Sequence, residues 1–451
     1  MNAFHDAGDT VLRTIWTALD RDDDELLSID APAHPVPLPA HTDVPGLAWG
    51  AVAAASAAAA SLAGAHVGAA LDPDRVAVAY ASDRVGRLDG VQPTSFAPLS
   101  GFFRSADGWV RTHGNYPHHA AALQRGLGLP AGAGRDEVTA ALAGMAASYA
   151  AESVTRAGGL CVAVAPEAPA QDEQLRAQPI VAARGILPSP PAPLPHATTD
   201  TPLRGIRVLD LTRVIAGPVG TRTLALLGAD VLRLDPPQLP ELGGQHLDTG
   251  HGKRTALLDL STSAGHAVFD RLLQTADVVA LGYRPAALAR LGLSPQALAR
   301  RRPGLVVAQH SAWGDADRRG FDSLVQAASG IAVVEGSADA PGVLPAQALD
   351  HTAGYLLAAG VLTALARRAH EGGSWLVTTS LRRIAAELLG LPRVQTPAAP
   401  RAFDSAAHTQ DFDVAGHRLT TAAPALAYEG GPRGYAPPRP WGGDAPAWRE
   451  R

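Results

Sequence analysis

The chain has 451 residues, of which 46% are hydrophobic and 18% charged, and its formal net charge is −5. This is the composition of a globular chain too long for one ordinary core, so two or three domains are expected. The negative charge provides no basic surface for nucleic acid, which is therefore not an expected partner. A single cysteine, Cys161, and a start without the basic and apolar stretches of a secretory signal predict a cytoplasmic location.

The first part of the chain mixes several patterns. Residues 1–42 are expected to form an irregular N-terminal extension, and residues 43–186 a first domain. Its run GLAWGAVAAASAAAASLAGAHVGAAL (46–71) has about the length of a membrane span. Because the run is built from Ala, Gly and Ser, it favours a tightly packed buried helix, and no membrane partner is expected. GGLCVAVAP, around Cys161, is typical of a strand in which the cysteine serves as a small buried hydrophobe.

A Pro-rich segment, LPSPPAPLPHATTDTP (187–202), predicts a linker, because proline cannot donate backbone hydrogen bonds to a strand ladder. Beyond it, strand and helix patterns alternate. The predicted strands are 206–211, 230–235, 254–260, 277–283 and 304–311, and the helical pieces include 217–228 and 264–276. Alternation of this kind predicts an α/β fold with a Rossmann-type, doubly wound parallel sheet over residues 203–345.

The usual phosphate-binding signatures are missing from this sheet. The sequence has no Walker-type loop, and no G-x-G-x-x-G follows the first strand, which disfavours a nicotinamide dinucleotide even though Asp235 ends the second strand. Basic side chains are stronger candidates for binding a phosphate group. Lys253 and Arg254 stand at the start of the predicted strand 254–260, and Arg284 and Arg290 lie beside the loop after the predicted strand 277–283. Such residues can clamp phosphates or can be solvated surface charge, and the pattern alone does not decide.

Three histidines in HGNYPHH, namely His113, His118 and His119, invite comparison with a metal site. Neither a carboxylate nor a cysteine stands at a supporting spacing, so we predict an ordinary loop and no metal.

Asp350 precedes the long apolar run HTAGYLLAAGVLTALARR and has two interpretations. It can cap a helix, because its carboxylate accepts backbone N–H groups of the first turn, or it can be a nucleophile. Asp43 stands before a similar apolar run, and RVAVAY (75–80) and WLVTTS (375–380) both have strand patterns, so a loose internal repeat is predicted. Asp43 lacks chemical motifs upstream and is interpreted as a cap.

Several motifs together resemble one known family. PLRGIRVLDLTRVIAGPVGTRTLALLGADVLRLDPP, HGKRTALLDL, GYRPAALARLG, GFDSLVQAASG and ALDHTAGYLLAAGVLTALARR occur in order over residues 202–390. In this they are similar to the family III CoA-transferases, or CaiB–BaiF family, which include formyl-CoA transferase, carnitine CoA-transferase and α-methylacyl-CoA racemase. APLSGFFRSADGWVRTHGNYPHHAAALQRGLGLP resembles the smaller domain of that family, which normally follows the catalytic Asp helix.

The resemblance implies a rearranged domain order. A smaller α+β domain with its preceding helix would occupy residues 43–186, a CoA-binding domain with the catalytic Asp residues 203–395, and a returning segment residues 396–451. Family members form interlocked dimers, so a homodimer is implied. CoA or acyl-CoA would bind as a substrate, together with a carboxylic acid, and no tightly bound cofactor is implied.

The resemblance also implies roles for single residues. Asp350 stands at the position of the nucleophilic carboxylate, whose ionised form the helix N-terminus would favour. The positions that contact CoA in family members are occupied here by Val214, Ile215, Lys253, Gly282, Tyr283, Ala287, Arg290 and Leu291.

The implied reaction moves CoA between an acyl-CoA thioester and a carboxylic acid through an aspartyl-CoA thioester. Racemase members carry a histidine where this chain has Phe321, so an acyl-CoA racemase is the disfavoured alternative. His351 follows Asp350 directly but would point elsewhere on a helix. A CoA-binding protein without turnover is the alternative from another class.

Overall fold

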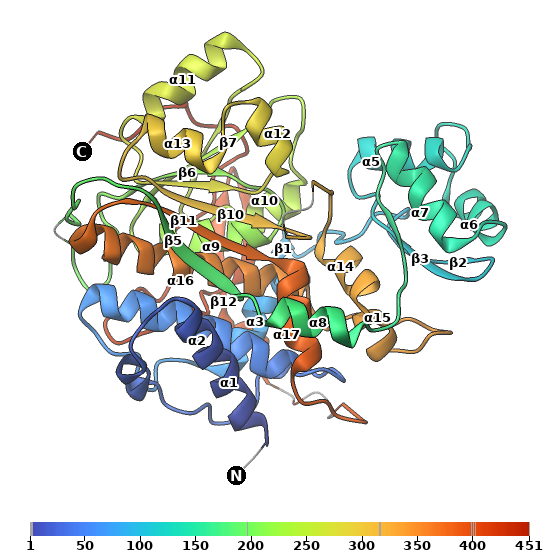
Figure 1. Ribbon diagram of the computed structural model, residues 1–451, viewed down its shortest axis with the longest axis horizontal. Coiled ribbons are helices and arrows are strands. Elements are labelled where there is room, and N and C mark those ends of the chain that lie inside the picture. Colours follow the sequence, from blue (N-terminus) through green and yellow to red (C-terminus); the bar gives the residue numbers. More distant parts are fainter. Residues whose placement is uncertain are drawn as a thin grey trace.

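The computed structural model describes residues 3–195, 197–314, 317–397, 399, 401 and 403–450. Its centre is a seven-stranded sheet in the order β5-β11-β10-β9-β6-β7-β8, seen edge-on in Figure 1. Every pairing from β11 to β8 is parallel, and β5 is antiparallel to β11. The strands are β5 (Val181–Leu187), β11 (Ser374–Ser380), β10 (Val306–Ser311), β9 (Val278–Leu281), β6 (Arg207–Leu211), β7 (Asp230–Asp235) and β8 (Arg254–Leu257).

Strand order reverses beside β6. The chain runs from β6 outward through β7 to β8, then returns to the other side of β6 and continues outward through β9, β10 and β11. At such a switch point the loops that follow the two adjacent strands diverge and leave a crevice for a ligand. The loops after β6 and β9 are those that carry Val214, Ile215, Gly282 and Tyr283.

Helices cover both faces of the sheet because alternate strand residues point to opposite sides. Val208 packs into the core beneath α9 (Ala216–Leu226) and α16 (Ala348–Glu371), whereas Leu209 packs into the opposite core with α11 (Ser263–Leu273) and α13 (Pro295–Arg301). Outside α16 lie α2 (Val44–Ala63) and α1 (Ala3–Ala18) (Figure 1).

Two of these helices, α2 and α16, have the length and composition of a membrane span. In each, the most apolar window is buried inside the protein, to 83% in α2 and 100% in α16. Both therefore serve as core helices here. The buried helix predicted over residues 46–71 is confirmed as far as Ala63, where Gly64 caps α2, and residues 64–71 are not helical. Asp43 is the N-cap of α2, because its carboxylate accepts the Gly46 N–H at 2.8 Å, which confirms the capping interpretation.

The smaller domain projects to one side of the sheet (Figure 1). It contains the antiparallel strands β2 (Gly101–Ser105), β3 (Gly108–Thr112) and β4 (Cys161–Ala163), with α5 (Pro117–Gly126), α6 (Arg135–Ala143) and α7 (Ala147–Arg156). Cys161 lies buried in β4, as its apolar surroundings predicted. The domain has its own core, formed around residues such as Val110, Leu123 and Val154.

The remaining elements connect or close these units. A third sheet joins β1 (Arg87–Leu88) to β13 (His417–Ala422) and β12 (Thr409–Val414). After β13 the chain returns to the large sheet, where the Asp444 N–H donates to the Thr255 carbonyl of β8 at 2.8 Å. The other helices are α3 (Pro73–Tyr80), α4 (Ser82–Val85), α8 (Pro169–Arg176), α10 (Gly243–Thr249), α12 (Pro285–Arg290), α14 (Asp322–Ser329), α15 (Ile331–Val334), α17 (Leu381–Gly390), η1 (Asp23–Ser28) and η2 (Ser405–His408).

The predicted repeat is wrong, because residues 75–80 form helix α3 while residues 375–380 form strand β11. Asp72 caps α3 by accepting the Asp74 N–H at 2.9 Å, and Pro73 occupies the first helical turn. The alternating Val and Ala residues of RVAVAY imitate a strand. They are buried on every side, however, so the alternation does not mark two faces.

Domain limits also differ from the predicted ones. In the predicted extension, Val11, Ile15 and Trp16 of α1 are fully buried against the core that contains α2. Of the predicted 43–186 domain, α2 and α3 pack with α16 and its neighbours, and β5 forms an edge of the large sheet. These segments carry apolar surface that only the large domain can cover.

Candidate active site

A cavity of about 350 Å³ lies where the loops after β6, β9 and β10 meet the first turn of α16, and the smaller domain closes its outer side. The lining is Tyr116, His118, His119, Arg213, Val214, Ile215, Ala216, Leu239, Gly282, Tyr283, Arg284, Pro285, Ala287, His310, Ser311, Ala312, Arg318, Arg319, Gly320, Phe321, Asp350 and Leu381. The structure thus brings six of the predicted site residues together, namely Asp350, Val214, Ile215, Gly282, Tyr283 and Ala287.

Three predicted site residues do not line this cavity. Lys253 is 2% exposed, and its Nζ donates to Asp210 Oδ2 at 3.0 Å and to the Pro218 carbonyl at 2.9 Å. Arg290 ends α12 with its side chain exposed, and Leu291 packs at the edge of the core beside α11 and α13. The implied CoA contacts of these three residues stay predictions.

Asp350 is not the N-cap of α16. The cap position is Gln347, and Asp350 lies in the first turn, where its own N–H donates to Asp322 Oδ2 at 2.9 Å. Asp322, at the start of α14, therefore does the capping, and the Gln326 amide donates to its other oxygen. Among the described residues no donor contacts the Asp350 carboxylate, which is 6% exposed and faces the cavity. The capping interpretation of Asp350 is wrong, and its carboxylate is left available for chemistry.

The two carboxyl groups affect each other's ionisation. Burial raises the pKa of Asp350 well above 3.8, and the nearby Asp322 raises it further. Burial also raises the pKa of Asp322, to about 6, although the N–H groups of Asp350 and Leu349 and the Gln326 amide oppose the shift. The sequence suggested that the helix N-terminus would keep Asp350 ionised. The structure differs, because Asp322 takes the backbone donors and adds a like charge.

Imidazoles reach the same cavity from elements that sequence reasoning did not connect. His119 comes from α5 of the smaller domain and His310 from the end of β10. Burial lowers the pKa of His119 to about 3 and that of His310 to about 4, so both rings are neutral near pH 7. Phe321 stacks on His113 with ring centroids 3.8 Å apart. His351 points away from the cavity and stacks on Tyr80 at 5.2 Å, as its position after Asp350 predicted.

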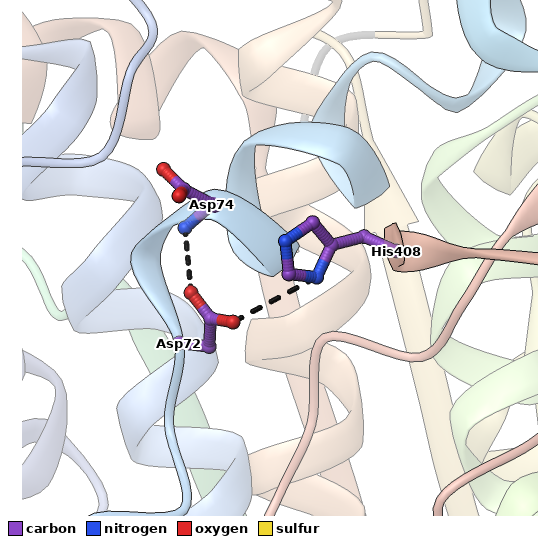
Figure 2. Close-up of side chains that lie close together, drawn as sticks. All are labelled: Asp72, Asp74 and His408. Atoms are coloured by element: carbon purple, nitrogen blue, oxygen red, sulfur yellow. Dashed lines mark hydrogen bonds and ion pairs between the residues drawn. The ribbon is translucent and has the colours of Figure 1, made fainter. Parts of the chain in front are cut away.

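Two possible metal clusters can be judged on their contacts. Figure 2 shows Asp72 and Asp74 of the α3 start beside His408. Asp72 already accepts the capping N–H, and both Asp74 oxygens accept from Arg401 Nη1 at 2.8 and 2.9 Å. Two of the three carboxyl and imidazole groups are therefore already engaged, Asp72 by a backbone N–H and Asp74 by a guanidinium. Of the HGNYPHH histidines, His118 and His119 lie in α5 rather than in the predicted loop and line the active-site cavity, whereas His113 lines a neighbouring cavity. No carboxylate joins the three into a metal cluster among the described residues.

Residues 203–428 match the sequence pattern of the family described as CoA-transferase family III. This chain belongs to that family. The family III match begins just before β6 and ends beyond β13, so it contains Asp350 and the switch-point loops.

The chain is also similar to individual proteins. The chain is 32% identical over 213 residues to the probable fatty acyl-CoA transferase Rv3272 of Mycobacterium tuberculosis, covering 43% of this chain and 54% of that protein. It is 32% identical over 196 residues to a formyl-CoA:oxalate CoA-transferase of Afipia carboxidovorans, covering 40% and 46%. A solved CAIB/BAIF family protein from Brucella suis is 25% identical, with a TM-score of 0.40 over 49% of this chain and 65% of that chain. The chain spans about half the length of the curated relatives it matches.

Proposed function

We propose that this family III member transfers CoA between an acyl-CoA thioester and a carboxylic acid, with Asp350 as the nucleophile. The observation that carries the proposal is the carboxylate of Asp350. It faces a cavity lined by five of the eight residues implied to contact CoA, and no described donor holds it in a purely structural role. Formyl-CoA:oxalate and acetyl-CoA:oxalate transferases among the relatives support this class of reaction.

The steps follow from the chemistry of thioesters. The Asp350 carboxylate attacks the thioester carbonyl, and the C–S bond breaks to give a mixed anhydride and CoA thiolate. The thiolate attacks the aspartyl carbonyl, which releases the donor acid and leaves an aspartyl-CoA thioester. The acceptor carboxylate then attacks that thioester, and its C–S bond breaks to give a second mixed anhydride and CoA thiolate. The thiolate attacks the acceptor carbonyl of this anhydride, which forms the new acyl-CoA and releases the Asp350 carboxylate. Over the cycle two C–S bonds break and two form.

Burial of Asp350 has two opposite effects on its reactivity as a nucleophile. A desolvated carboxylate is a stronger nucleophile, but only its ionised form attacks, and the pKa of Asp350 is raised. The Asp322 bond to the Asp350 N–H fixes the backbone of the nucleophile. We therefore expect the rate to rise with pH through the raised pKa of Asp350.

Intact-protein mass spectrometry after mixing with a panel of acyl-CoAs tests the proposal. An adduct of CoA mass is expected that hydroxylamine removes and that Asp350→Asn does not form. Asp43→Asn is a matched control, because Asp43 is also a buried acid with a raised pKa at the start of an apolar helix, outside this cavity. An adduct that persists in Asp350→Asn would refute the assignment. If CoA binds but no thioester gives an adduct, a non-catalytic CoA-binding protein is favoured.

A second candidate, an acyl-CoA isomerase or racemase, is supported by His119 and His310. The sequence disfavoured it because Phe321 replaces an imidazole, but these two neutral rings line the same cavity as Asp350. One group would remove the α-proton and another would return a proton to the opposite face. Incubation in deuterium oxide distinguishes the reactions, since isomerisation places deuterium on the α-carbon without CoA exchange, and His119→Gln would abolish it.

The homodimer implied by the resemblance stays a prediction. Light scattering coupled to size-exclusion chromatography of the full chain would measure it.

A further inference from the structure

Glu241 lies outside the active-site cavity, in the connection between β7 and α10, with a side chain that is fully buried. Its Oε2 is 2.8 Å from Arg233 Nη2, and its Oε1 is 3.3 Å from Arg213 Nη2. Burial alone would raise its pKa, but Arg233 and Arg213 more than offset this and lower the pKa to about 2. Glu241 is therefore a buried anion at neutral pH.

This anion accepts hydrogen bonds from two segments of the cavity wall. The Val214 N–H donates to Oε2 at 3.2 Å, and the Tyr116 hydroxyl of the smaller domain donates to Oε1. The Arg213 guanidinium also lies over the Tyr116 ring, 4.9 Å from its centroid. One carboxylate thus joins a loop of the large sheet to the closing face of the smaller domain.

Val214 needs such support because its backbone is in an unfavourable conformation. Its φ is +69°, in the left-handed region that a β-branched residue rarely adopts. A residue held there requires contacts that fix it, and such residues cluster at functional sites. Both Val214 and Tyr116 also separate the active-site cavity from a second cavity of about 80 Å³, so their positions define one wall of the first.

We propose that Glu241 is a positioning residue that holds Val214 in its left-handed conformation and fastens Tyr116 of the smaller domain over the cavity. Its effect on CoA affinity rests on the proposed function, whereas its effect on the two segments does not. The charge matters as well as the shape, because two guanidinium groups and three neutral donors, the third being the Leu242 N–H, converge on the same carboxylate.

Hydrogen–deuterium exchange of the full, unliganded chain tests the positioning directly. Glu241→Gln is expected to speed exchange at the Val214 amide and in residues 113–118 on the order of tenfold, because the bonds to a charged acceptor are weakened. Asp230→Asn is the matched control. It removes a carboxylate that pairs with Arg254 at 2.9 Å, on the same domain but away from the cavity, and should leave both segments unchanged. Unchanged exchange in Glu241→Gln, or equal changes in the control, would overturn the proposal.

Affinity measurements then connect the positioning to the site. Glu241→Gln is expected to weaken binding of CoA on the order of tenfold by calorimetry. Adding Val214→Gly should recover most of that loss, because glycine adopts a positive φ without the Cβ penalty. A double variant that binds no better than Glu241→Gln would overturn the role through Val214. If the wild-type chain binds no CoA, the proposed function fails, and the exchange experiment still decides whether Glu241 holds the two segments.

Discussion

Lys253 offers a direct test of whether a predicted ligand contact is a structural ion pair. Its ammonium group and the Asp210 carboxylate are both buried, 3.0 Å apart, with side-chain exposures of 1% and 0%. Lys253→Met keeps the apolar length of the side chain but leaves Asp210 without its cation. Removing one partner of a buried pair costs about 3–5 kcal/mol, because the remaining charge is uncompensated. With roughly 2–4 °C per kcal/mol for domains of 150–250 residues, the melting temperature should fall by about 6–20 °C.

The double variant Lys253→Met, Asp210→Asn distinguishes a structural ion pair of Lys253 from a contact of Lys253 with CoA. Asn can still accept from the Thr212 N–H, which lies 3.0 Å from Asp210 Oδ1, and it carries no charge. The double variant should therefore regain most of the lost stability in thermal and urea unfolding. CoA affinity, measured by calorimetry below the melting temperature, should change little in either variant. A Lys253→Met protein that melts like the wild type but loses CoA binding would refute this reasoning and place the cation on the ligand.

Three further predictions follow from single contacts. Between pH 3.8 and its raised pKa, Asp350 binds a proton in the folded chain but not in the unfolded one, so stability falls as pH rises through this window. In thermal scans across pH, Asp350→Asn should therefore have a higher melting temperature than the wild type at pH 7–8, and this difference should vanish below about pH 3.8. A difference that does not change with pH would contradict the raised pKa of Asp350. Gly282→Ala would place a Cβ 2.7 Å from His310 Cε1 and weaken CoA binding, whereas Gly243→Ala meets nothing within 4 Å and should bind normally in the same titration. Asp72→Ala should lower the free energy of unfolding by about 1 kcal/mol, because the N-cap of α3 is lost. Added Zn²⁺ should leave the melting temperature of the wild type unchanged, and an increase with Zn²⁺ would contradict the interpretation of Asp72 and Asp74 as a cap and an ion-pair partner.

The sequence predicted the large sheet well because each strand is a short apolar run between helices. The five strands predicted over residues 206–311 all occur, with starts within two residues of those expected. Residues 75–80 failed because the run from Val76 to Tyr80 is buried throughout, so no polar residue within it shows the helical period. The edge strand β5 also escaped prediction, because its place in the sheet depends on β11, far along the chain.

The parts of the candidate site that lie at strand ends could be predicted from the sequence. The parts that depend on contacts between residues far apart in the chain could not. Asp350 and the switch-point loops follow from strand ends and from the family resemblance. The role of Asp322 depends on its 2.9 Å bond to a backbone N–H 28 residues away, and a sequence pattern records no such bond. His119 reaches the cavity wall only because the smaller domain packs there, so it could not be assigned before that domain was placed. The bond from Tyr116 to Glu241 also joins the two domains and was hidden for the same reason.

The packing of α2 on α16 has a consequence for synthesis on the ribosome. Helix α2 ends at Ala63, but α16, which covers its apolar surface, begins only at Ala348. At about 5–20 residues per second, roughly 15–60 s pass between the two. During that time α1 is the main element of the nascent chain that can pack on α2. The part of the apolar surface of α2 that α16 buries in the folded protein therefore stays exposed. The chain should therefore depend on chaperones that hold exposed apolar segments until translation reaches the second half.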